Sequence, residues 1–530
     1  QAAPWLAPGG AKERRMRGIA VVWLAALLSI AWADGLREAT LILRGEPPYT
    51  AAYNMKLPGI YAAYALILLL FGQSATGIHL GLLLVNVGTI LLVYVLGKRL
   101  LGTWVGIVAC ACYAAMSLNA KGLALAAHAT HFVTLCSVGG LVLLLKAIET
   151  RKWTTLLGSG LLLGLGFTMK QCGGFLALFG GLYLAWSLLR ERPVRWGGSI
   201  GKVAAFASSA AIPFGVCCLI ELLAGEFDKF WFWTVRFPSE YASLPLKEGL
   251  ECLKANSVRA IGPYAWIWIL ALIGLTAPVW NRTARSRWVF LLGFAVFSAL
   301  STSSSLYFRE HYYIVLLPAV SLLAAVAVSS AWEALSRPIV PRWARHLPVL
   351  ALLLALGYPI FQQSSILFEM TPSQACRAIY GANPFLEAVG VADYISKRTR
   401  ETDTIAVLGS EAEIYFYARR RAATSYIYVY SLVQPQRYAV DMRQEMIRQI
   451  ERAKPKYLVF VAAGMSWAAY PGHEKPLIDW FSNYTARHYE PVGLVDTVSL
   501  DRTDYYWERD AIGRNPASPW HIWVLRRRSS

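Results

Sequence analysis

The chain has 530 residues, of which 56% are apolar and only 16% are charged. Soluble proteins carry about 25% charged residues, so this composition excludes an ordinary soluble enzyme and indicates a polytopic membrane protein. The formal net charge of +19 would suit a nucleic-acid-binding protein. The basic residues, however, gather in short segments between apolar runs, so membrane topology accounts for much of the excess and no nucleic-acid partner is expected.

Basic clusters fix the expected topology. Segments rich in Lys and Arg tend to stay in the cytoplasm, and if all clusters lie there, each interval between them holds an even number of crossings. The clusters are Lys12–Arg17, Lys98–Arg99, Lys146–Lys152, Arg190–Lys202, Arg282–Arg287 and Arg337–Arg345. A membrane helix needs about 20 residues. Eleven spans fit: residues 18–33, 79–97, 103–118, 127–146, 154–169, 172–189, 203–224, 262–280, 288–302, 312–331 and 347–362.

One further apolar run, residues 57–72, should not cross the membrane. A crossing here would move every later basic cluster to the outer face. The run is therefore predicted to lie along the membrane surface, within an outer loop at 34–78. With the N-terminus inside, an odd number of spans also places the C-terminal part outside.

The composition changes to that of a soluble domain near residue 384, after a predicted linker at 363–383. Short β-branched and aromatic runs alternate with helical patterns, which is typical of an α/β domain. The strands are expected at 405–408, 425–429, 457–461, 491–498 and 521–526, and the helices at 384–398, 411–420, 438–453 and 474–488. The predicted organisation is a membrane domain at 1–362 and an outer α/β domain at 384–530.

Ionisable residues at the outer edge of the bundle are the first candidates for function. Asp34 and Glu38 are four residues apart, hence on one face if the segment is helical. One of them could act as a general base. His128 and His131 have i, i+3 spacing at the mouth of a predicted span, and His311 lies in another outer turn. Two histidines are an incomplete zinc site, so local hydrogen bonding is the alternative reading and no metal is expected.

Several short motifs then follow one another in a characteristic order. They are Gly45-Glu46-Pro47-Pro48-Tyr49, Lys56-Leu57-Pro58-Gly59-Ile60-Tyr61, Phe71-Gly72, Lys170-Gln171 and Arg309-Glu310-His311-Tyr312. In this order the chain resembles the glycosyltransferase 39 group, which has the GT-C fold and includes protein O-mannosyltransferases and lipid A aminoarabinose transferases. The resemblance spans the membrane part, and the C-terminal domain is similar to outer domains of many bacterial members.

This resemblance implies transfer of a sugar from a polyprenyl-phosphate carrier to a hydroxyl acceptor on the outer face, with inversion. It implies Asp34, or secondly Glu38, as the base. Cations from outer segments would hold the lipid phosphate, namely Lys56, Lys170, Arg236 and Arg309. Further site candidates are Tyr49, Tyr61, His128, His131, His311 and Tyr312. No nucleotide or other cofactor is expected, and the acceptor is a glycan, lipid or protein. The expected location is the bacterial inner membrane, with the N-terminus in the cytoplasm and the C-terminal domain in the periplasm.

The chain departs from the family pattern at three positions. Gly35 follows Asp34 where relatives carry tandem acids, Leu57 replaces a proline after Lys56, and Thr130 stands where relatives carry glutamate. A flippase for lipid-linked glycans and a non-catalytic scaffold of the same fold are therefore the alternatives. Cys252 and Cys376 both fall in outer segments, where a disulfide between them is conceivable.

Overall fold

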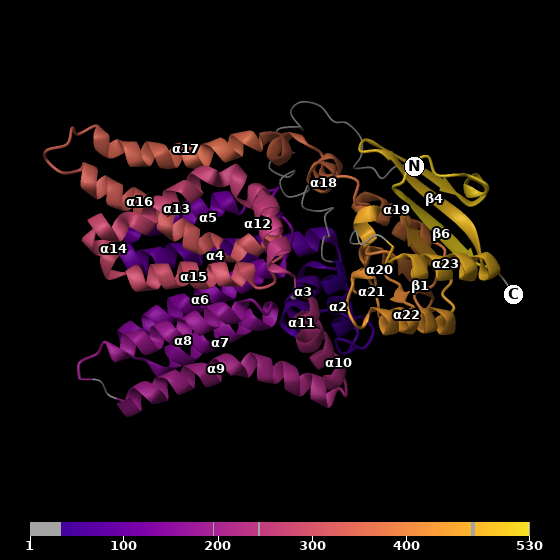
Figure 1. The fold of residues 1–530 in the computed structure, drawn as a ribbon, viewed down its shortest axis with the longest axis horizontal. Helices are drawn as coiled ribbons and strands as arrows, with labels where there is room; N and C mark the ends of the chain where they lie inside the picture. The colour runs from indigo at the N-terminus through magenta and orange to yellow at the C-terminus, as the bar shows by residue number, and fades with distance from the viewer. Residues whose placement is uncertain (1–32, 194–195, 242–243, 468–471, 529–530) are drawn as a thin grey trace.

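A computed structural model of the chain describes residues 33–193, 196–241, 244–467 and 472–528. The first basic cluster, and the predicted span 18–33 apart from Ala33, lie outside the described residues. A bundle of long helices occupies one side of the molecule and an α/β domain caps one end of the bundle (Figure 1).

Every predicted span within the described residues forms a helix. These helices are α4 (Ala75–Leu101), α5 (Thr103–Met116), α6 (Ala129–Thr150), α7 (Trp153–Met169), α8 (Gly173–Leu189), α9 (Trp196–Leu223), α13 (Ala265–Trp280), α15 (Trp288–Ser303), α16 (Leu317–Leu335) and α17 (Leu347–Gln362). Six helical stretches are long and apolar enough to cross a membrane, and α5, α7, α8 and α15 are shorter apolar helices. The chain is therefore a multi-pass membrane protein.

Helix α16 begins five residues later than predicted. Residues Glu310–Val315 form a separate 3-10 helix, and Pro318 occupies the first turn of α16. Proline lacks the backbone N–H and is favoured in the first turn, so the helix starts beside it. The 3-10 helix carries the Arg-Glu-His-Tyr motif out of the span and into the outer end of the bundle.

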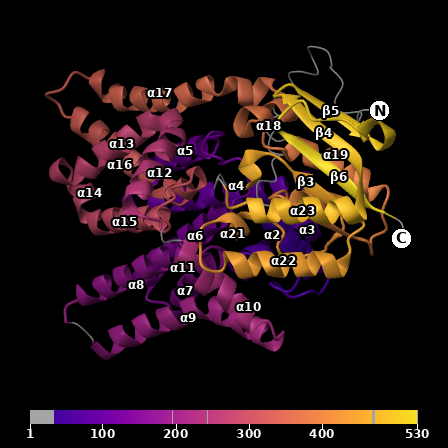
Figure 2. The ribbon, with the colours of Figure 1, turned by 45° about the vertical axis from the view of Figure 1, so that its right-hand side comes forward.

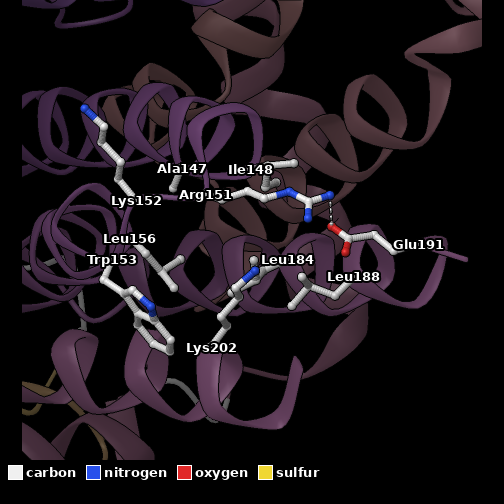
Figure 3. A pocket seen from close by; sticks show the side chains of 10 residues that line it. All are labelled: Ala147, Ile148, Arg151, Lys152, Trp153, Leu156, Leu184, Leu188, Glu191 and Lys202. Carbon is white, nitrogen blue, oxygen red and sulfur yellow. Dashed lines mark ion pairs between the residues drawn. The ribbon is translucent and has the colours of Figure 1, made fainter. Parts of the chain in front are cut away.

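Several basic clusters of the described residues lie at the end of the bundle away from the α/β domain. Arg99 pairs with Glu149 at 2.7 Å, and Arg151 pairs with Glu191 at 3.4 Å. Figure 3 shows the second pair spanning the ends of α6 and α8, with Lys202 of α9 close by. α14 (Arg282–Ser286) lies at the same end in Figure 1. The three clusters that these contacts join therefore share one side, as the parity argument predicts.

The outer loop contains two helices, α2 (Ala33–Leu43) and α3 (Pro58–Phe71). The backbone N–H of Tyr53 donates to the carbonyl of Ser425 at 2.7 Å, and the Gln73 amide donates to the carbonyl of Phe416 at 3.2 Å. Both flanks of α3 thus contact the α/β domain. This helix begins and ends at one end of the bundle, as expected for a helix that lies along the membrane surface. Figure 1 shows α2 and α3 beside α20 (Glu413–Ala418) and α21 (Tyr430–Val433) of that domain, and Figure 2 shows them beside α21.

The second long outer segment is also helical. It contains α10 (Phe227–Trp231), a π-helical turn (Phe232–Arg236), α11 (Phe237–Tyr241), α12 (Leu246–Ile261) and a 3-10 turn (Gly262–Tyr264). The predicted linker is ordered too, because it contains a π-helical turn (Ser365–Glu369) and α18 (Pro372–Tyr380). Thr371 caps α18 through a reciprocal hydrogen-bond pair with Gln374.

The α/β domain is built on a six-stranded sheet of order β2-β1-β3-β6-β4-β5. Its parallel part is followed by antiparallel β6, β4 and β5. The strands are β1 (Thr404–Leu408), β2 (Arg421–Ala422), β3 (Tyr457–Val461), β4 (Tyr489–Ser499), β5 (Arg502–Trp507) and β6 (His521–Arg527). The helices are α19 (Phe385–Ser396), α20 (Glu413–Ala418), α21 (Tyr430–Val433), α22 (Ala439–Ala453) and α23 (Lys475–His488).

One expectation for this domain is wrong. Residues 425–429 form no strand, because the N–H of Ser425 donates to the Gln449 side chain and its carbonyl accepts from Tyr53. The segment is thereby drawn out of the sheet toward the outer loop, and β2 ends at Ala422. The strand β5 was not predicted. Cys252 and Cys376 are both free thiols, so no disulfide joins them.

Candidate functional site

The carbonyl of Lys56 is held from two sides. The Tyr49 hydroxyl donates to it at 2.6 Å and the Tyr61 hydroxyl at 3.0 Å. Both tyrosines are fully buried, whereas Lys56 is half-buried. The N–H of Lys56 donates to the Asn54 side chain at 3.2 Å. Tyr49 and Tyr61, two of the predicted site residues, therefore fix the backbone that carries the lysine.

The neighbouring turn between α7 and α8 packs tightly against this loop. The Gln171 amide donates to the carbonyl of Met55 at 2.7 Å. A Cβ added at Gly59 would lie 2.6 Å from the carbonyl oxygen of Thr168. Glycine at this position thus permits a close backbone approach that a larger residue would prevent. The Lys-Leu-Pro-Gly and Lys-Gln motifs, far apart in sequence, are consequently adjacent.

Lys170 lies in that same turn and is enclosed by aromatic and cationic groups. Its ammonium stands 3.7 Å from the centre of the Tyr312 ring, in a cation–π contact. Burial, and next the charge of Arg309, lower the pKa of Lys170 to about 8. The lysine is therefore still mainly a cation at neutral pH.

His128 and His311 stack face to face beside this lysine. Their ring centres are 4.1 Å apart and the planes differ by 4°. Burial lowers the pKa of both imidazoles well below the usual value, and the charges of Lys170 and Lys56 lower it further. Arg309 also acts on His311. Both rings are thus neutral and lie among these cations.

The three cations Lys56, Lys170 and Arg309 therefore converge at the end of the bundle that bears the α/β domain, around the histidine pair. They come from the outer loop, the α7–α8 turn and the segment before α16. Arg309 also faces the Tyr307 ring at 5.6 Å. Three positive groups gathered in one place suit an anion. We refer to Lys56, Lys170 and Arg309 as the cationic cluster.

Arg236 does not join this cluster in the contacts described for the chain. Its side chain is exposed at the end of the π-helical turn. The same turn touches the site through its backbone, because the Gln171 amide also approaches the carbonyl of Thr234 at 3.4 Å.

The two predicted acids lie in α2. Both positions fall in one helix, as their spacing predicts, but the side chain of Asp34 lies outside the described residues. A Cβ added at Gly35 would lie 3.7 Å from the ammonium of Lys56, so the first turn of α2 faces the cluster. Glu38 is fully buried, and its charge raises the pKa of Tyr49 after the larger effect of burial. Glu38 is thus enclosed by the protein next to the loop that carries Tyr49.

His128 lies close to His131, as their spacing predicts, and its ring also stacks on His311. His131 is buried within α6, directly after Thr130, which is also buried. Among the described residues, no group of three or more His, Cys, Asp or Glu side chains is placed to hold a metal ion.

Sequence reasoning assigned no role to three residues around the site. Gln171 bridges two outer segments, and Tyr53 connects the loop to the α/β domain. Glu221, near the end of α9, is buried, and its carboxylate has no hydrogen-bond partner among the described residues. A charge inside a predicted span was the available signal for Glu221. Nothing local distinguished Tyr53 from other interfacial aromatics.

Comparison with known proteins gives one family match and several fold matches. Residues 56–213 match the family model of dolichyl-phosphate-mannose-protein mannosyltransferase. No curated protein matches the chain. Among solved structures, ArnT from Cupriavidus metallidurans bound to undecaprenyl phosphate is 14% identical, with a TM-score of 0.57 over 99% of this chain and 98% of that one.

The same enzyme in its apo state gives 15% identity and a TM-score of 0.52, over 98% of each chain. The archaeal oligosaccharyltransferase AglB from Archaeoglobus fulgidus, in complex with an inhibitory peptide and a dolichol-phosphate, is 13% identical. Its TM-score is 0.52, over 95% of this chain and 75% of that one. At these identities the likeness establishes a shared fold.

Proposed function

The chain is a multi-pass membrane protein of the GT-C glycosyltransferase fold, and on that premise we propose that it transfers a sugar from a polyprenyl-phosphate carrier to a hydroxyl acceptor. The single observation that carries the proposal is the cationic cluster of Lys56, Lys170 and Arg309 at the outer end of the bundle. Two of the similar solved structures hold a lipid phosphate, undecaprenyl phosphate in ArnT and dolichol-phosphate in AglB. The cluster supplies the charge that such a ligand requires.

The proposed reaction is a single displacement. The acceptor oxygen attacks the anomeric carbon and forms the new glycosidic bond. The bond from that carbon to the phosphate oxygen breaks, and the lipid phosphate leaves with the electron pair. Asp34 takes up the proton of the attacking hydroxyl group, as the family resemblance implies. Attack from the side opposite the phosphate inverts the anomeric configuration.

The cations act on the leaving group. Negative charge accumulates on the phosphate as the bond to the sugar breaks, and fixed cations stabilise such charge most where water is excluded. Arg309 can grip two phosphate oxygens with its planar guanidinium, whereas Lys56 and Lys170 act as point charges. The neutral His128–His311 pair separates these cations without adding to their mutual repulsion.

The proposed setting is a bacterial inner membrane, with the basic end of the bundle in the cytoplasm and the α/β domain in the periplasm. The polyprenyl tail would then lie in the bilayer while its phosphate reaches the cationic cluster at the outer surface. Positive-inside asymmetry supports this orientation, because the clusters joined by Arg99–Glu149 and Arg151–Glu191 gather at the end away from the domain.

The test is turnover of a labelled donor. Purified full-length protein in nanodiscs is incubated with radiolabelled polyprenyl-phosphate sugars and a panel of glycan, lipid and peptide acceptors. Transfer of label with release of free lipid phosphate is expected, with an inverted anomeric centre in the product. In proteoliposomes, movement of intact donor between leaflets without cleavage would instead identify a flippase. Neither cleavage nor movement with any donor would favour a scaffold.

A further inference from the structure

The α/β domain does more than cover the outer loop. We propose that Glu445, on α22 of that domain, is a positioning residue. It holds the loop that carries Lys56 in the position where this lysine can bind the lipid phosphate. The inference rests on the proposed function, because it takes Lys56 as a phosphate ligand. It makes the outer domain a working part of the donor site.

The first observation is a backbone bridge between the domain and the loop. The Tyr53 N–H donates to the carbonyl of Ser425 at 2.7 Å, and the Ser425 hydroxyl donates to the carbonyl of Thr50 at 3.3 Å. The segment 425–429 leaves the sheet to make this contact. Tyr53 is three residues before Lys56, so the bridge holds the chain close to the functional lysine.

The second observation is that the Glu445 carboxylate accepts hydrogen bonds from both the α/β domain and the outer loop. Glu445 accepts from the Tyr426 hydroxyl at 2.7 Å, from the Tyr53 hydroxyl at 3.3 Å and from the Gln449 amide at 3.1 Å. Burial, with the Glu445 charge next, raises the pKa of Tyr53 to about 12. The Tyr53 hydroxyl is therefore a donor at neutral pH, and one side chain of the domain connects to the loop.

The third observation is the aromatic packing around Tyr53. Its ring stacks on Trp233 with centres 5.2 Å apart and meets the edge of Tyr426 at 5.1 Å. Trp233 belongs to the π-helical turn, whose Thr234 carbonyl is approached by Gln171. Gln171 also holds Met55, next to Lys56.

These contacts form one chain of neighbours. The domain holds Tyr53, Tyr53 packs on the π-helical turn, and that turn and the Met55 carbonyl meet at Gln171. Because Gln171 directly follows Lys170, the same set of contacts sets the separation of Lys56 from Lys170. Loss of the Glu445 carboxylate removes the hydrogen bonds of the Tyr53 and Tyr426 hydroxyls together. The loop would then shift relative to Lys170, although the cationic side chains themselves are unchanged.

The experiment is a double-mutant cycle on affinity for undecaprenyl phosphate, measured with full-length protein in nanodiscs at fixed pH and salt. Glu445→Ala is expected to weaken binding about tenfold, which is the effect of a modest change in site geometry. Glu445→Gln is expected to recover most of the affinity, because its amide oxygen still accepts a hydrogen bond. The matched control is Glu451→Ala, on the same helix, whose partner Trp480 lies within the domain.

The double-mutant cycle distinguishes a positioning role of Glu445 from a general loss of protein stability. In a Lys56→Ala background, Glu445→Ala is expected to cause no further loss, since the group that it positions is gone. Titrations extend a hundredfold beyond the wild-type Kd so that the double variant remains measurable. If Glu445→Ala does not fold, Tyr426→Phe removes one hydroxyl and keeps the ring, and it should show a smaller loss with the same non-additivity.

Three outcomes would overturn the proposal. Unchanged affinity in Glu445→Ala would show that the junction does not act on the site. An equal loss with and without Lys56 would show an effect on the whole fold. If Lys56→Ala alone binds undecaprenyl phosphate like the wild type, the proposed function fails as well. A normal loss in Lys56→Ala with no effect of Glu445→Ala would reject the positioning role alone.

Discussion

Tyr49 donates its hydroxyl to the carbonyl of Lys56 at 2.6 Å, and this bond joins the two ends of the outer loop segment that carries the functional lysine. Tyr49 itself has a positive φ of 62°, a conformation that L-residues rarely adopt. The loop is therefore held in a strained turn by a buried hydrogen bond, with Tyr61 as a second donor to the same carbonyl. Its geometry is fixed before any ligand arrives.

Removal of that hydroxyl should loosen the loop without removing any charge. Tyr49→Phe keeps the buried ring and deletes the bond, which is expected to cost about 1 kcal/mol of stability and to raise the donor KM several-fold. The double variant with Tyr61→Phe leaves the carbonyl without either donor and should be markedly worse. Thermal unfolding and steady-state kinetics measure the two effects. A Tyr49→Phe protein with wild-type KM would show that Tyr61 alone suffices.

The pH dependence of donor use should report Lys170. Its pKa lies near 8, below the ordinary 10.5, so the free protein loses this positive charge as pH rises through about 8. Attraction for the donor phosphate is present below that pH and lost above it. We expect kcat/KM for a polyprenyl-phosphate sugar to fall above about pH 8.

Arginine stays protonated throughout this range. Lys170→Arg should therefore remove the alkaline fall, even if the absolute rate is lower. An unchanged alkaline limb in this variant would assign the titration to another group.

The stacked histidines should not affect the pH dependence of kcat/KM in the acid range. Burial and neighbouring cations lower the pKa of His128 and His311 well below 6.5, so both stay neutral near that pH. The sugar-bearing donor is a phosphodiester that does not titrate there. kcat/KM is expected to stay flat between about pH 6 and 7, around the ordinary histidine pKa. An inflection near 6.5 that disappears in His311→Phe would contradict this arrangement.

Gly59 should not tolerate a side chain. A Cβ at this position would lie 2.5 Å from the Thr168 hydroxyl and 2.6 Å from its carbonyl oxygen, so the loop and the α7–α8 turn would be pushed apart. Gly59→Ala is expected to destabilise the protein by about 1–3 kcal/mol and to reduce donor turnover. Gly215→Ala is the matched control, since a Cβ there meets nothing within 4 Å. Equal unfolding midpoints for the two variants would contradict the close approach.

Much of the fold could be predicted because its determinants are local. Apolar length and the basic clusters locate the membrane helices, and the alternation of short strands and helices identifies the outer domain. Residues 425–429 were predicted as a strand from their β-branched and aromatic content, but Tyr53 and Gln449 bind their backbone instead. That outcome depends on contacts between distant segments, which a local pattern does not contain.

The candidate site, like the fold, could be predicted only where its features are local in sequence. Lys56, Lys170 and Arg309 were expected together because each lies in an outer segment, and the structure gathers them. His128 was expected near His131 from helical spacing, and it lies there, but the stack of its ring on His311 was not predicted. Arg236 was grouped with the cations by side of the membrane alone, and its side chain is exposed. Sharing one face of a membrane does not determine which side chains meet.

The most direct test of the central claim is the release of free polyprenyl phosphate from a radiolabelled polyprenyl-phosphate sugar by purified protein. Wild-type protein is compared with Lys56→Ala and with Lys121→Ala, which removes an exposed lysine from the turn before α6. We predict release by the wild type and Lys121→Ala, and a loss of about a hundredfold or more in Lys56→Ala. Equal release by all three proteins would contradict the assignment of the cationic cluster as the site of the donor phosphate.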